Sequence, residues 1–522
     1  MSEKKDSPGV SRRRFLTTTA AAAVTASLAR RSKAQGYTTP TTNNGPWVRV
    51  SLTDPAAPAM LASYQTAITA LLNLSPNDCR NFYRNAMIHT LDCPHGNWWF
   101  LLWHRGYIGW WEQTVRQLSG NPNFAFPYWD WTAQPYVPDA FWQGVLNPSN
   151  SAFISNWNDF QTQYQPAMTT FYAGLSAAQQ TQLNDRGLPT VNDLFSAMSQ
   201  GMFFPPSQAR SLTQANPNFD AFTKQTVSLS TLQSALATPY FAGGGSSGNP
   251  PGGFGSDIVA QHSDSTSQGI LESEPHNNVH NDVGGFMGNF LSPVDPIFMA
   301  HHSNIDRIWT LWSGTMPTGQ DLTNLQNEPF LFYCNSQGQP VTQNTAGSYI
   351  PIGSFNYSYT KGSGATTSSS EAAPQTVRKV TGTLTATDLA FSKAAVAKVA
   401  LPAGTASRAS GAPSHVRAHI TIQPPSDTKN IRFHVFVNPP DNELALDANH
   451  PSYAGTFEFF GRMHHAHPMT FTVPLDDALN DQRAAGTLRS DQLNIVIVPQ
   501  SRGVALRAMP KASVTKVEVS TS

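Results

Sequence analysis

Apolar residues recur at helical spacing through the first two thirds of the chain and at strand spacing in the last third. Residues 55–74 have helical periodicity, and the stretch SPND at 75–78 has the residues of a helix start: an N-cap, a proline and an acid. In the helix predicted to follow, Phe82, Ala86 and His89 share one face. We therefore expect His89 to point into an apolar interior.

A further predicted helix begins near Trp103 and carries His104 on its apolar face. The residues that share this face are Tyr107, Ile108, Trp111, Val115 and Leu118. His95 precedes His104 by nine residues, a helical rotation of about 900°, and so lies half a turn away from that face. Because Pro94 and Gly96 flank it, we expect His95 to approach from a loop.

A second histidine-rich region follows a loop-rich insert. His276 and His280 are four residues apart after Pro275, so one helix face can present both to a single ion. In MAHHSNIDRIWTLW at 299–312, His301 and His302 both border the apolar stripe. Adjacent helical residues diverge by about 100°, so we expect only one of the two to be a ligand, and the periodicity does not choose between them.

Beyond residue 360 the pattern changes. Residues 361–375, KGSGATTSSSEAAPQ, have the composition of a flexible linker. The segments after it alternate apolar and polar residues between Pro, Asn and Asp turns: VRKVTGTLTA, HVRAHITIQ, IRFHVFVN, GTFEFF, MTFTVPL and LNIVIVP. We predict a mainly α catalytic domain at 37–360 with long loops, then an all-β sandwich at 376–520.

Composition narrows the class of protein. Lys+Arg and Asp+Glu both number 33, so the formal net charge is zero. The chain therefore lacks the excess of basic residues that would indicate nucleic-acid binding. SRRRFL at 11–16 precedes a short stretch of small and apolar residues, a pattern that resembles a twin-arginine export signal. We expect residues 1–34 to be this signal, and the protein to be exported to the periplasm or secreted. The stretch is shorter than the roughly 20 residues of a membrane-spanning helix, so no membrane association is expected.

The chain's fifteen histidines are not scattered: seven of them form the two groups His89, His95, His104 and His276, His280, His301, His302. Imidazole sets without a carboxylate or thiolate suit copper or zinc, not magnesium or calcium. Six ligands imply two ions. Hydrolytic metal pairs generally recruit bridging carboxylates, so an all-histidine pair favours copper that changes oxidation state and binds O2.

These motifs resemble the tyrosinase and polyphenol oxidase family of type 3 copper proteins. The resemblance is carried by HGNWWFLLWHR at 95–105, PYWDW at 127–131, PHNNVH at 275–280 and DPIFMAHHSNIDRIW at 295–309. It implies a four-helix bundle holding a dicopper centre, with O2 as co-substrate and phenols as substrates. One copper would be bound by His89, His95 and His104, and the other by His276, His280 and His302, with His301 beside the ligands.

The resemblance also implies roles for residues near the histidines. Three cysteines, Cys79, Cys93 and Cys334, leave at least one thiol over. Cys93 stands at the spacing where fungal members form a thioether with the ligand histidine, here His95; the alternative is a free buried cysteine. Glu272 and Asn277 would polarise a water that takes the phenol proton, and Phe290 would be a gate over the second copper.

The C-terminal domain implies regulation. In the family such a domain often caps the active site, and we expect the capping residue within 442–453, NELALDANHPSY. The motif MHHAH at 463–467 is either a copper-loading site or a solvated strand end.

The resemblance predicts a tyrosinase that hydroxylates monophenols in the ortho position and oxidises o-diphenols to o-quinones. The alternatives are a catechol oxidase without hydroxylase activity and an O2 carrier like haemocyanin.

Overall fold

The computed structural model describes residues 46–199, 209–342, 344–365, 377–389, 394–402, 415–424, 431–440, 447–461, 467–488, 490–502 and 512–521. The predicted export signal, most of the predicted linker and residues 463–466 of the MHHAH motif lie outside these ranges.

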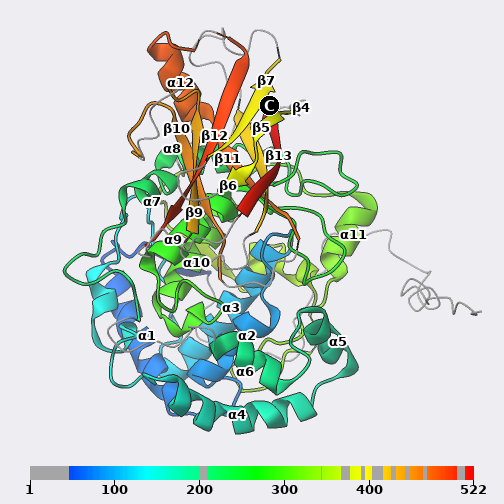
Figure 1. Ribbon diagram of the computed structural model, residues 1–522. Helices are drawn as coiled ribbons and strands as arrows, with labels where there is room; N and C mark the ends of the chain where they lie inside the picture. Colours follow the sequence, from blue (N-terminus) through cyan, green and yellow to red (C-terminus); the bar gives the residue numbers. More distant parts are fainter. Residues whose placement is uncertain are drawn as a thin grey trace, which may run out of the picture. The chain divides into compact units, whose positions relative to one another are not determined.

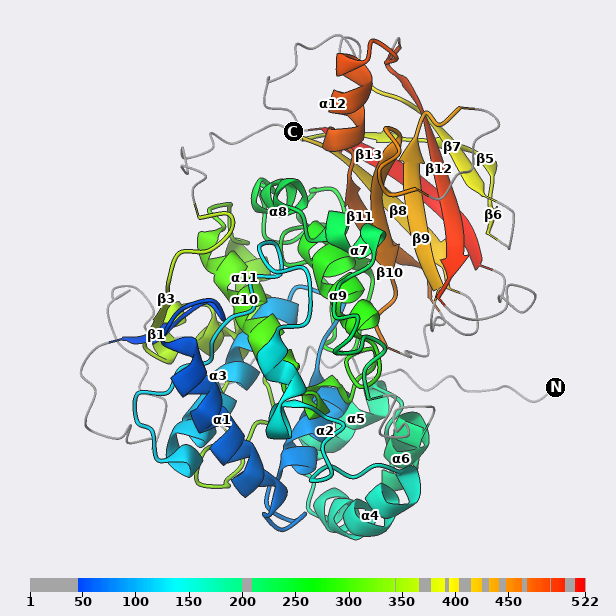
Figure 2. The same ribbon diagram turned by 90° about the vertical axis from the view of Figure 1, so that its left-hand side faces the viewer.

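Five helices build the frame around the histidines: α1 (Ala57–Leu72), α2 (Phe82–Asp92), α3 (Phe100–Ser119), α9 (Asn277–Val283) and α10 (Ile297–Leu311). α3 packs between α1 and α10 (Figures 1 and 2). The remaining helices of this domain are peripheral: α4 (Trp157–Ala173), α5 (Ala177–Asp185), α6 (Val191–Ser199), α7 (Ala221–Thr226), α8 (Leu229–Leu236) and α11 (Gly319–Asn327).

The start predicted at 75–78 is wrong, because α2 begins at Phe82. The Oδ1 of Asn81 accepts hydrogen bonds from the backbone N–H groups of Tyr83 and Arg84, which satisfies two donors that the first helical turn leaves unpaired. The Oγ of Ser75 accepts instead from the N–H of Asn77 in a turn.

The C-terminal domain consists of two sheets, as predicted. The five-stranded sheet has the order β10 (Tyr453–Glu458), β9 (Ile431–Val437), β12 (Gln492–Ser501), β7 (Ala395–Ala400), β5 (Thr383–Ala386). The six-stranded sheet has the order β2 (Ser267–Gln268), β11 (Met469–Pro474), β8 (Val416–Gln423), β13 (Ala512–Thr521), β4 (Arg378–Thr381), and β6 (Asp388–Leu389) pairs with β13. α12 (Asp476–Ala484) follows β11.

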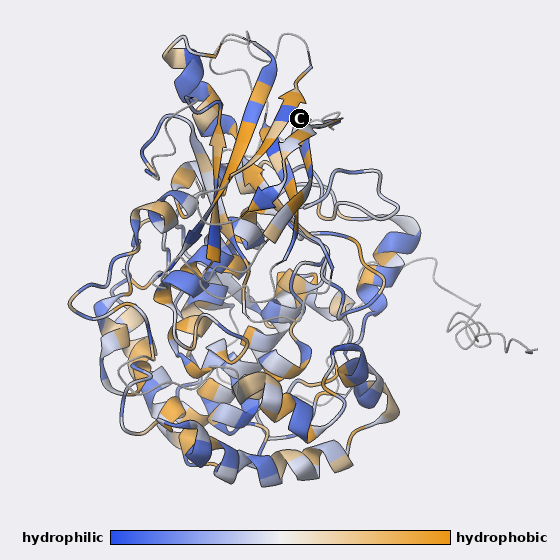
Figure 3. Ribbon diagram, viewed as in Figure 1, coloured by the Kyte–Doolittle hydropathy of each residue, from blue (hydrophilic) through white to orange (hydrophobic). Residues whose placement is uncertain are grey.

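Alternation along the strands forms the core of this domain. Ile420 of β8, Phe433 of β9 and Ile495 of β12 are fully buried in one apolar cluster that both sheets contribute to. Figure 3 shows apolar and polar positions alternating along the long strands. The prediction of a mainly α domain followed by a domain of antiparallel sheets is therefore confirmed. Strands β7 and β13 were not expected.

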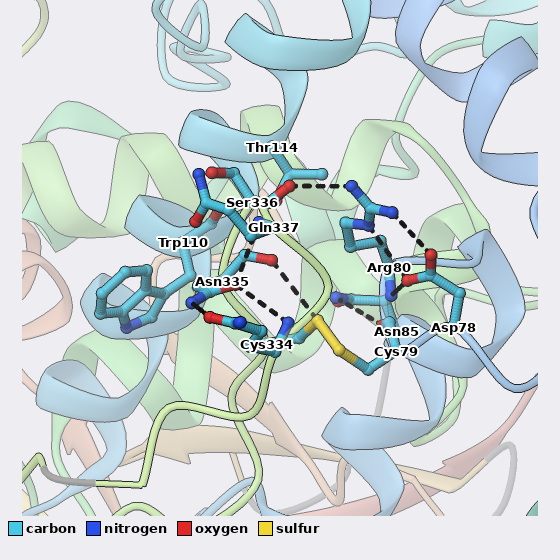
Figure 4. The surroundings of a disulfide bond; sticks show 11 residues. Asp78, Cys79, Arg80, Asn85, Trp110, Thr114, Cys334, Asn335, Ser336 and Gln337 are labelled. Atoms are coloured by element: carbon cyan, nitrogen blue, oxygen red, sulfur yellow. Dashed lines mark hydrogen bonds and ion pairs between the residues drawn. A yellow bond between two sulfur atoms is a disulfide. The ribbon is translucent and has the colours of Figure 1, made fainter. Parts of the chain in front are cut away.

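A disulfide joins Cys79, just before α2, to Cys334, which follows α11 (Figure 4). Beside it, the Arg80 guanidinium pairs with Asp78 at 2.7 Å and donates to the carbonyl of Ser336 at 2.9 Å. Cys93 is the remaining thiol and is buried.

Within the described residues, no helix combines the length and the apolar character needed to cross a membrane.

Candidate metal centre

The first histidine group combines two helices and a loop. His89 lies on α2 and His104 on α3, while His95 lies in the segment between these helices, as predicted. The ligand atoms of these three residues and of Cys93 lie within 4.8 Å of one another, and all four residues are buried.

The second group lies on α10 and on a helical turn that leads into α9. Residues Glu272–His276 form a π-helical turn, and His276 at its end lies over His280 with ring centroids 4.5 Å apart. His301 and His302 complete the group, again within 4.8 Å. A π-turn at this place is typical of a functional site, since it displaces the helical register around a ligand.

The two groups face each other in one interior. The imidazoles of His104 and His302 stack in parallel, with centroids 4.0 Å apart. Two phenylalanines that the motifs did not single out lie between the groups. Phe100 contacts His104 and His276 at centroid distances of 4.7 and 4.8 Å, and Phe298 contacts His89 and His302 at 5.2 and 4.2 Å.

Hydrogen bonds at Nδ1 orient four of the rings. His89, His104 and His280 each place Nδ1 2.6–2.8 Å from a backbone carbonyl, that of Phe290, Phe100 and Met287 respectively. His276 directs Nδ1 to the Oδ1 of Asn277 at 2.8 Å. This pattern leaves Nε2 as the lone-pair nitrogen, which is the arrangement that metal-binding histidines adopt.

The Nε2 atoms of His89 and His276 are buried and have no hydrogen-bond partner among the residues that the structure describes. A buried polar atom without a partner is costly, and a metal ion removes that cost. Burial also lowers the pKa of both imidazoles to about 3, so the rings are neutral and able to bind a metal. The two groups, His89, His95, His104 and His276, His280, His302, fit a binuclear copper site.

His301 differs from His302 in its neighbours. Its ring faces Trp129 and Trp131 of the PYWDW motif at 6.5 Å, whereas His302 stacks on the first group. Proximity to His276 and His280 does not separate the two residues, so the assignment of His302 over His301 stays a prediction.

Cys93 lies against the first group. Its Sγ is 3.7 and 3.9 Å from the two ring nitrogens of His95 and 3.3 Å from the Nε2 of His104. Burial raises the pKa of this thiol well above its usual value, so it is not a thiolate in the metal-free chain. The predicted thioether to His95 stays a prediction.

Glu272 connects the two groups. Its Oε1 accepts from the backbone N–H of Gly96 at 2.7 Å, directly after His95, and its Oε2 accepts from the hydroxyl of Ser256 at 2.7 Å. Gly96 has φ +67°, and a Cβ there would lie 2.3 Å from the Oγ of Ser265, so the turn requires glycine. Burial raises the pKa of Glu272 to about 8, against the opposing effect of these hydrogen bonds.

Asn277 is linked to Glu272 through Gln268. Its Nδ2 donates to the Oε1 of Gln268 at 2.8 Å and to the backbone carbonyl of Glu458 at 2.7 Å. Gln268 in turn donates to Glu272 at 3.3 Å. Gln268 is therefore a site residue that the motifs did not reveal, since it stands on β2, outside both histidine signatures.

Phe290 lies beside the first group. Its ring is 5.7 Å from His89 and 5.3 Å from His95, and its carbonyl orients His89. Phe290 thus borders the first histidine group. Its predicted role as a gate over the second copper stays a prediction.

A residue of the C-terminal domain enters the centre. Phe460, two residues beyond β10, is 3% exposed, and its ring lies 4.7 Å from His95, 4.5 Å from His280 and 5.3 Å from Phe290. The expectation that 442–453 supplies the capping residue is wrong for its described part, since Tyr453 packs on Phe222 of α7. Residues 441–446 lie outside the described ranges.

Main-chain and ionic contacts hold the C-terminal domain at this place. β2, in the helical part of the chain, pairs in parallel with β11 and so extends the six-stranded sheet. Arg502 forms ion pairs with Glu458 at 2.6 Å and with Asp282 of α9 at 2.5 Å. The C-terminal domain, which places Phe460 against the histidines, is thus joined to the helical domain by strand pairing and by ion pairs.

The central part of the chain is similar to known proteins of one family. A model of the common central domain of tyrosinase matches residues 68–315. (+)-Larreatricin hydroxylase of Larrea tridentata is 26% identical over 286 residues, which cover 50% of this chain and 40% of that protein. A tyrosinase of Hahella sp. is 28% identical over 254 residues, covering 48% and 43%. The chain spans less than half the length of these curated relatives.

Among solved structures, a latent aurone synthase (polyphenol oxidase) superposes with a TM-score of 0.57 at 19% identity, covering 92% of this chain and 91% of that one. A latent apple tyrosinase superposes with a TM-score of 0.53 at 17% identity, covering 93% and 99%. At these identities the likeness concerns the fold, including the C-terminal domain.

Proposed function

Because residues 68–315 belong to the tyrosinase family and carry its type 3 copper-like site, we propose that this protein is an exported tyrosinase. It hydroxylates monophenols in the ortho position and oxidises the resulting o-diphenols to o-quinones. The observation that carries the proposal is the pair of buried histidine groups that face each other with lone-pair nitrogens turned inward.

Copper bound by His89, His95, His104 and by His276, His280, His302 would supply the redox change that activates O2. The surrounding residues orient the histidine rings and shield the centre from water. Phe100 and Phe298 fill the space between the two groups and exclude water, and the carbonyls of Phe290, Phe100 and Met287 hold the rings in place.

Glu272 and Asn277 provide the proton path in this proposal. The carboxyl of Glu272 is poised near neutral pH by its burial, which suits a group that accepts a proton from a phenol through water. One N–H of Asn277 is occupied by the carbonyl of Glu458. Withdrawal of the segment that carries Phe460 frees this donor and a ring-sized space at the same time, so the capped form is latent.

The test is substrate turnover by the copper-loaded full chain and by its Phe460→Ala variant. We expect slow turnover by the full chain, and faster darkening of both tyrosine and a catechol by the variant. Darkening with catechol alone would favour a catechol oxidase. Reversible O2 binding without turnover by a variant that holds two coppers would contradict an enzyme and favour a carrier.

A further inference from the structure

The indole of Trp103 lies directly against the first histidine group. Its ring centroid is 5.1 Å from that of His104 and 5.7 Å from that of His89, and the side chain is fully buried. The Nε1–H of Trp103 donates to the Oδ2 of Asp92, the last residue of α2, at 2.7 Å. An electron-rich ring therefore contacts two of the proposed copper ligands and is hydrogen-bonded to a carboxylate.

Asp92 favours a positive charge on that indole. Its Oδ1 accepts from the Nε2 of Gln182 and lies 3.6 Å from the Nε2 of His262, so both oxygens of the carboxylate face nitrogen donors. A negative charge that is hydrogen-bonded to a ring stabilises the cation of that ring, and the effect is larger in a dry interior than in water. Trp103 is thus placed to give up an electron more readily than an indole without such a partner.

A continuous row of rings leads from Trp103 away from the histidines. The ring of Tyr333 lies 5.6 Å from that of Trp103, and its hydroxyl donates to the Trp103 carbonyl at 2.6 Å. The ring of Tyr349 lies 5.7 Å from that of Tyr333, and its hydroxyl accepts from the Nε1–H of Trp110 at 3.0 Å. The row returns to α3 two helical turns, or about 10.5 Å of helix axis, beyond its start.

The row ends nearer to solvent than it begins. Trp103 is fully buried, whereas Trp110 is 8% exposed. All four members carry an indole or a phenol, the aromatic side chains that lose a single electron most easily. Because hydrogen bonds fix each neighbouring pair, the rings keep the short separations over which an electron moves rapidly between them.

We propose that this aromatic row carries electrons from an external reductant to the copper centre and so removes oxidising equivalents that no phenol consumes. The inference rests on the proposed function and adds a second activity, the reduction of peroxide. Phe460 lies against His95 and His280 in the capped chain, so a small oxidant reaches the histidines more easily than a phenol does. The capped chain therefore needs another source of electrons.

The electrons and atoms of this activity balance with ascorbate as the reductant. Two ascorbates each lose one electron and one proton at the Trp110 end of the row. The electrons pass inward one at a time, and the N–H proton of Trp103 stays in its hydrogen bond to Asp92. Hydrogen peroxide takes up the two electrons and two protons from solvent, its O–O bond breaks, and two waters form.

The first experiment measures ascorbate consumption, by its absorbance, in the full chain with two coppers and hydrogen peroxide. Trp110→Phe should lower the rate to that of the copper-free chain, because phenylalanine is not oxidised. Trp110→Tyr should retain the activity, since a phenol gives up an electron, whereas a role in packing alone would make the two variants alike. Trp111→Phe, at the next and equally buried position of α3, is the matched control and should change nothing.

Two outcomes of that experiment would overturn the inference. One is unchanged consumption in Trp110→Phe, and the other is the same loss in Trp110→Tyr as in Trp110→Phe.

A second experiment omits ascorbate and locates the damage. The indole of Trp110 then supplies both electrons and gains the oxygen of one water, which releases two protons. Mass spectrometry of the digested native chain should find one added oxygen at Trp110, and in Trp110→Phe the oxygen should appear at Trp103 instead. Equal oxidation of Trp110 and Trp111 in the native chain would show that the row does not direct the electrons.

The role of Asp92 is tested with Asp92→Asn, which keeps an acceptor for Trp103 and removes the negative charge. With two coppers bound, this chain should consume ascorbate more slowly than the native chain, and in the Phe460→Ala background it should still oxidise catechol at the rate of Phe460→Ala alone. A parallel fall of both rates would contradict an effect through Trp103.

Catechol also separates the two levels of failure. If the Phe460→Ala chain with two coppers leaves catechol unoxidised, the proposed function fails, and this inference fails with it. If that chain oxidises catechol while the capped Trp110→Phe chain consumes ascorbate as fast as the native one, only the inference fails.

Discussion

In the first histidine group both oriented rings bind backbone carbonyls of the helical domain. In the second group His280 does the same, but His276 binds the side chain of Asn277. That same asparagine binds the C-terminal domain through the carbonyl of Glu458. The third ring of each group also differs: His95 lies beside the Cys93 thiol, and His302 stacks on His104.

The difference separates two kinds of support. The first group takes its hydrogen bonds from the helical domain, near the disulfide and the buried thiol, although Phe460 also contacts His95. The second group depends in part on whether the cap is docked. Changes to Cys79 or Cys93 should therefore affect the first group, and changes to Asn277 should affect the second.

The largest effect is expected from removing a ligand. His302→Ala should reduce bound copper from two ions to one and abolish turnover, because two imidazoles bind copper much more weakly than three. His301→Ala is the matched variant and should retain both ions. Metal analysis after desalting measures the stoichiometry; the reverse result would make His301 the ligand and His302 its neighbour.

Removing the disulfide should destabilise the frame of the first group. It links residues 255 apart in sequence, so Cys79→Ser with Cys334→Ser should lower the free energy of unfolding by about 5 kcal/mol in the chain-entropy model. Urea unfolding of the copper-free chain measures the change. An unchanged midpoint would mean that the packing around α2 holds this region without the bond.

Cys93→Ser should weaken copper binding by the first group only. If the thioether forms, the native chain lacks two hydrogens at the Cys93–His95 peptide, and the variant retains its full mass. We expect about tenfold weaker binding of one copper ion, as is usual when a group that orients a ligand is lost. A native peptide of unreduced mass would reject the thioether, and weakening of the second site instead would reject the independence of the two groups.

Asn277→Gly should act on the second group. Because it removes the partner of His276 Nδ1 and the donor near the proposed water, we expect monophenol hydroxylation to fall about tenfold further than catechol oxidation. Paired assays in the Phe460→Ala background measure both rates. Equal loss of the two activities would restrict Asn277 to orienting His276.

A change in the pH dependence of stability is expected at Glu272, which links the groups. Its pKa is raised to about 8 in the folded chain by burial, so the folded state keeps a proton that the unfolded state releases above the ordinary pKa of a glutamate. The stability that this proton contributes is complete at low pH and declines as pH rises toward 8. Copper-free Glu272→Gln should lose less stability than the native chain between about pH 5 and about pH 9 in urea titrations; parallel losses would contradict the raised pKa.

Much of the centre was predictable because local spacing places the histidines. The helical positions of His89 and His104, the loop position of His95 and the pairing of His276 with His280 all follow from residues fewer than ten apart. The alternating strands were predictable for the same reason, since successive side chains of a strand face opposite sides of the sheet.

Other features had no local signal. Asn81 caps α2, although SPND at 75–78 matches the sequence signature of a helix start more closely. Tertiary packing therefore decides at which residue the helix begins. Gln268 and Phe460 belong to the centre only because β2 pairs with β11 and β10 ends beside α9. Cys79 and Cys334 form a disulfide across 255 residues. The sequence alone does not show which two of the three cysteines pair.

The order of residues thus specifies which imidazoles form the two groups and where most of the strands lie, because periodicity and short spacings act over a few residues. Which carbonyl orients each ring, which thiol remains beside His95, and which aromatic side chain fills the centre are decided when distant segments pack. Those outcomes follow from the burial of polar groups, each of which must find a partner wherever the folded chain brings one within reach.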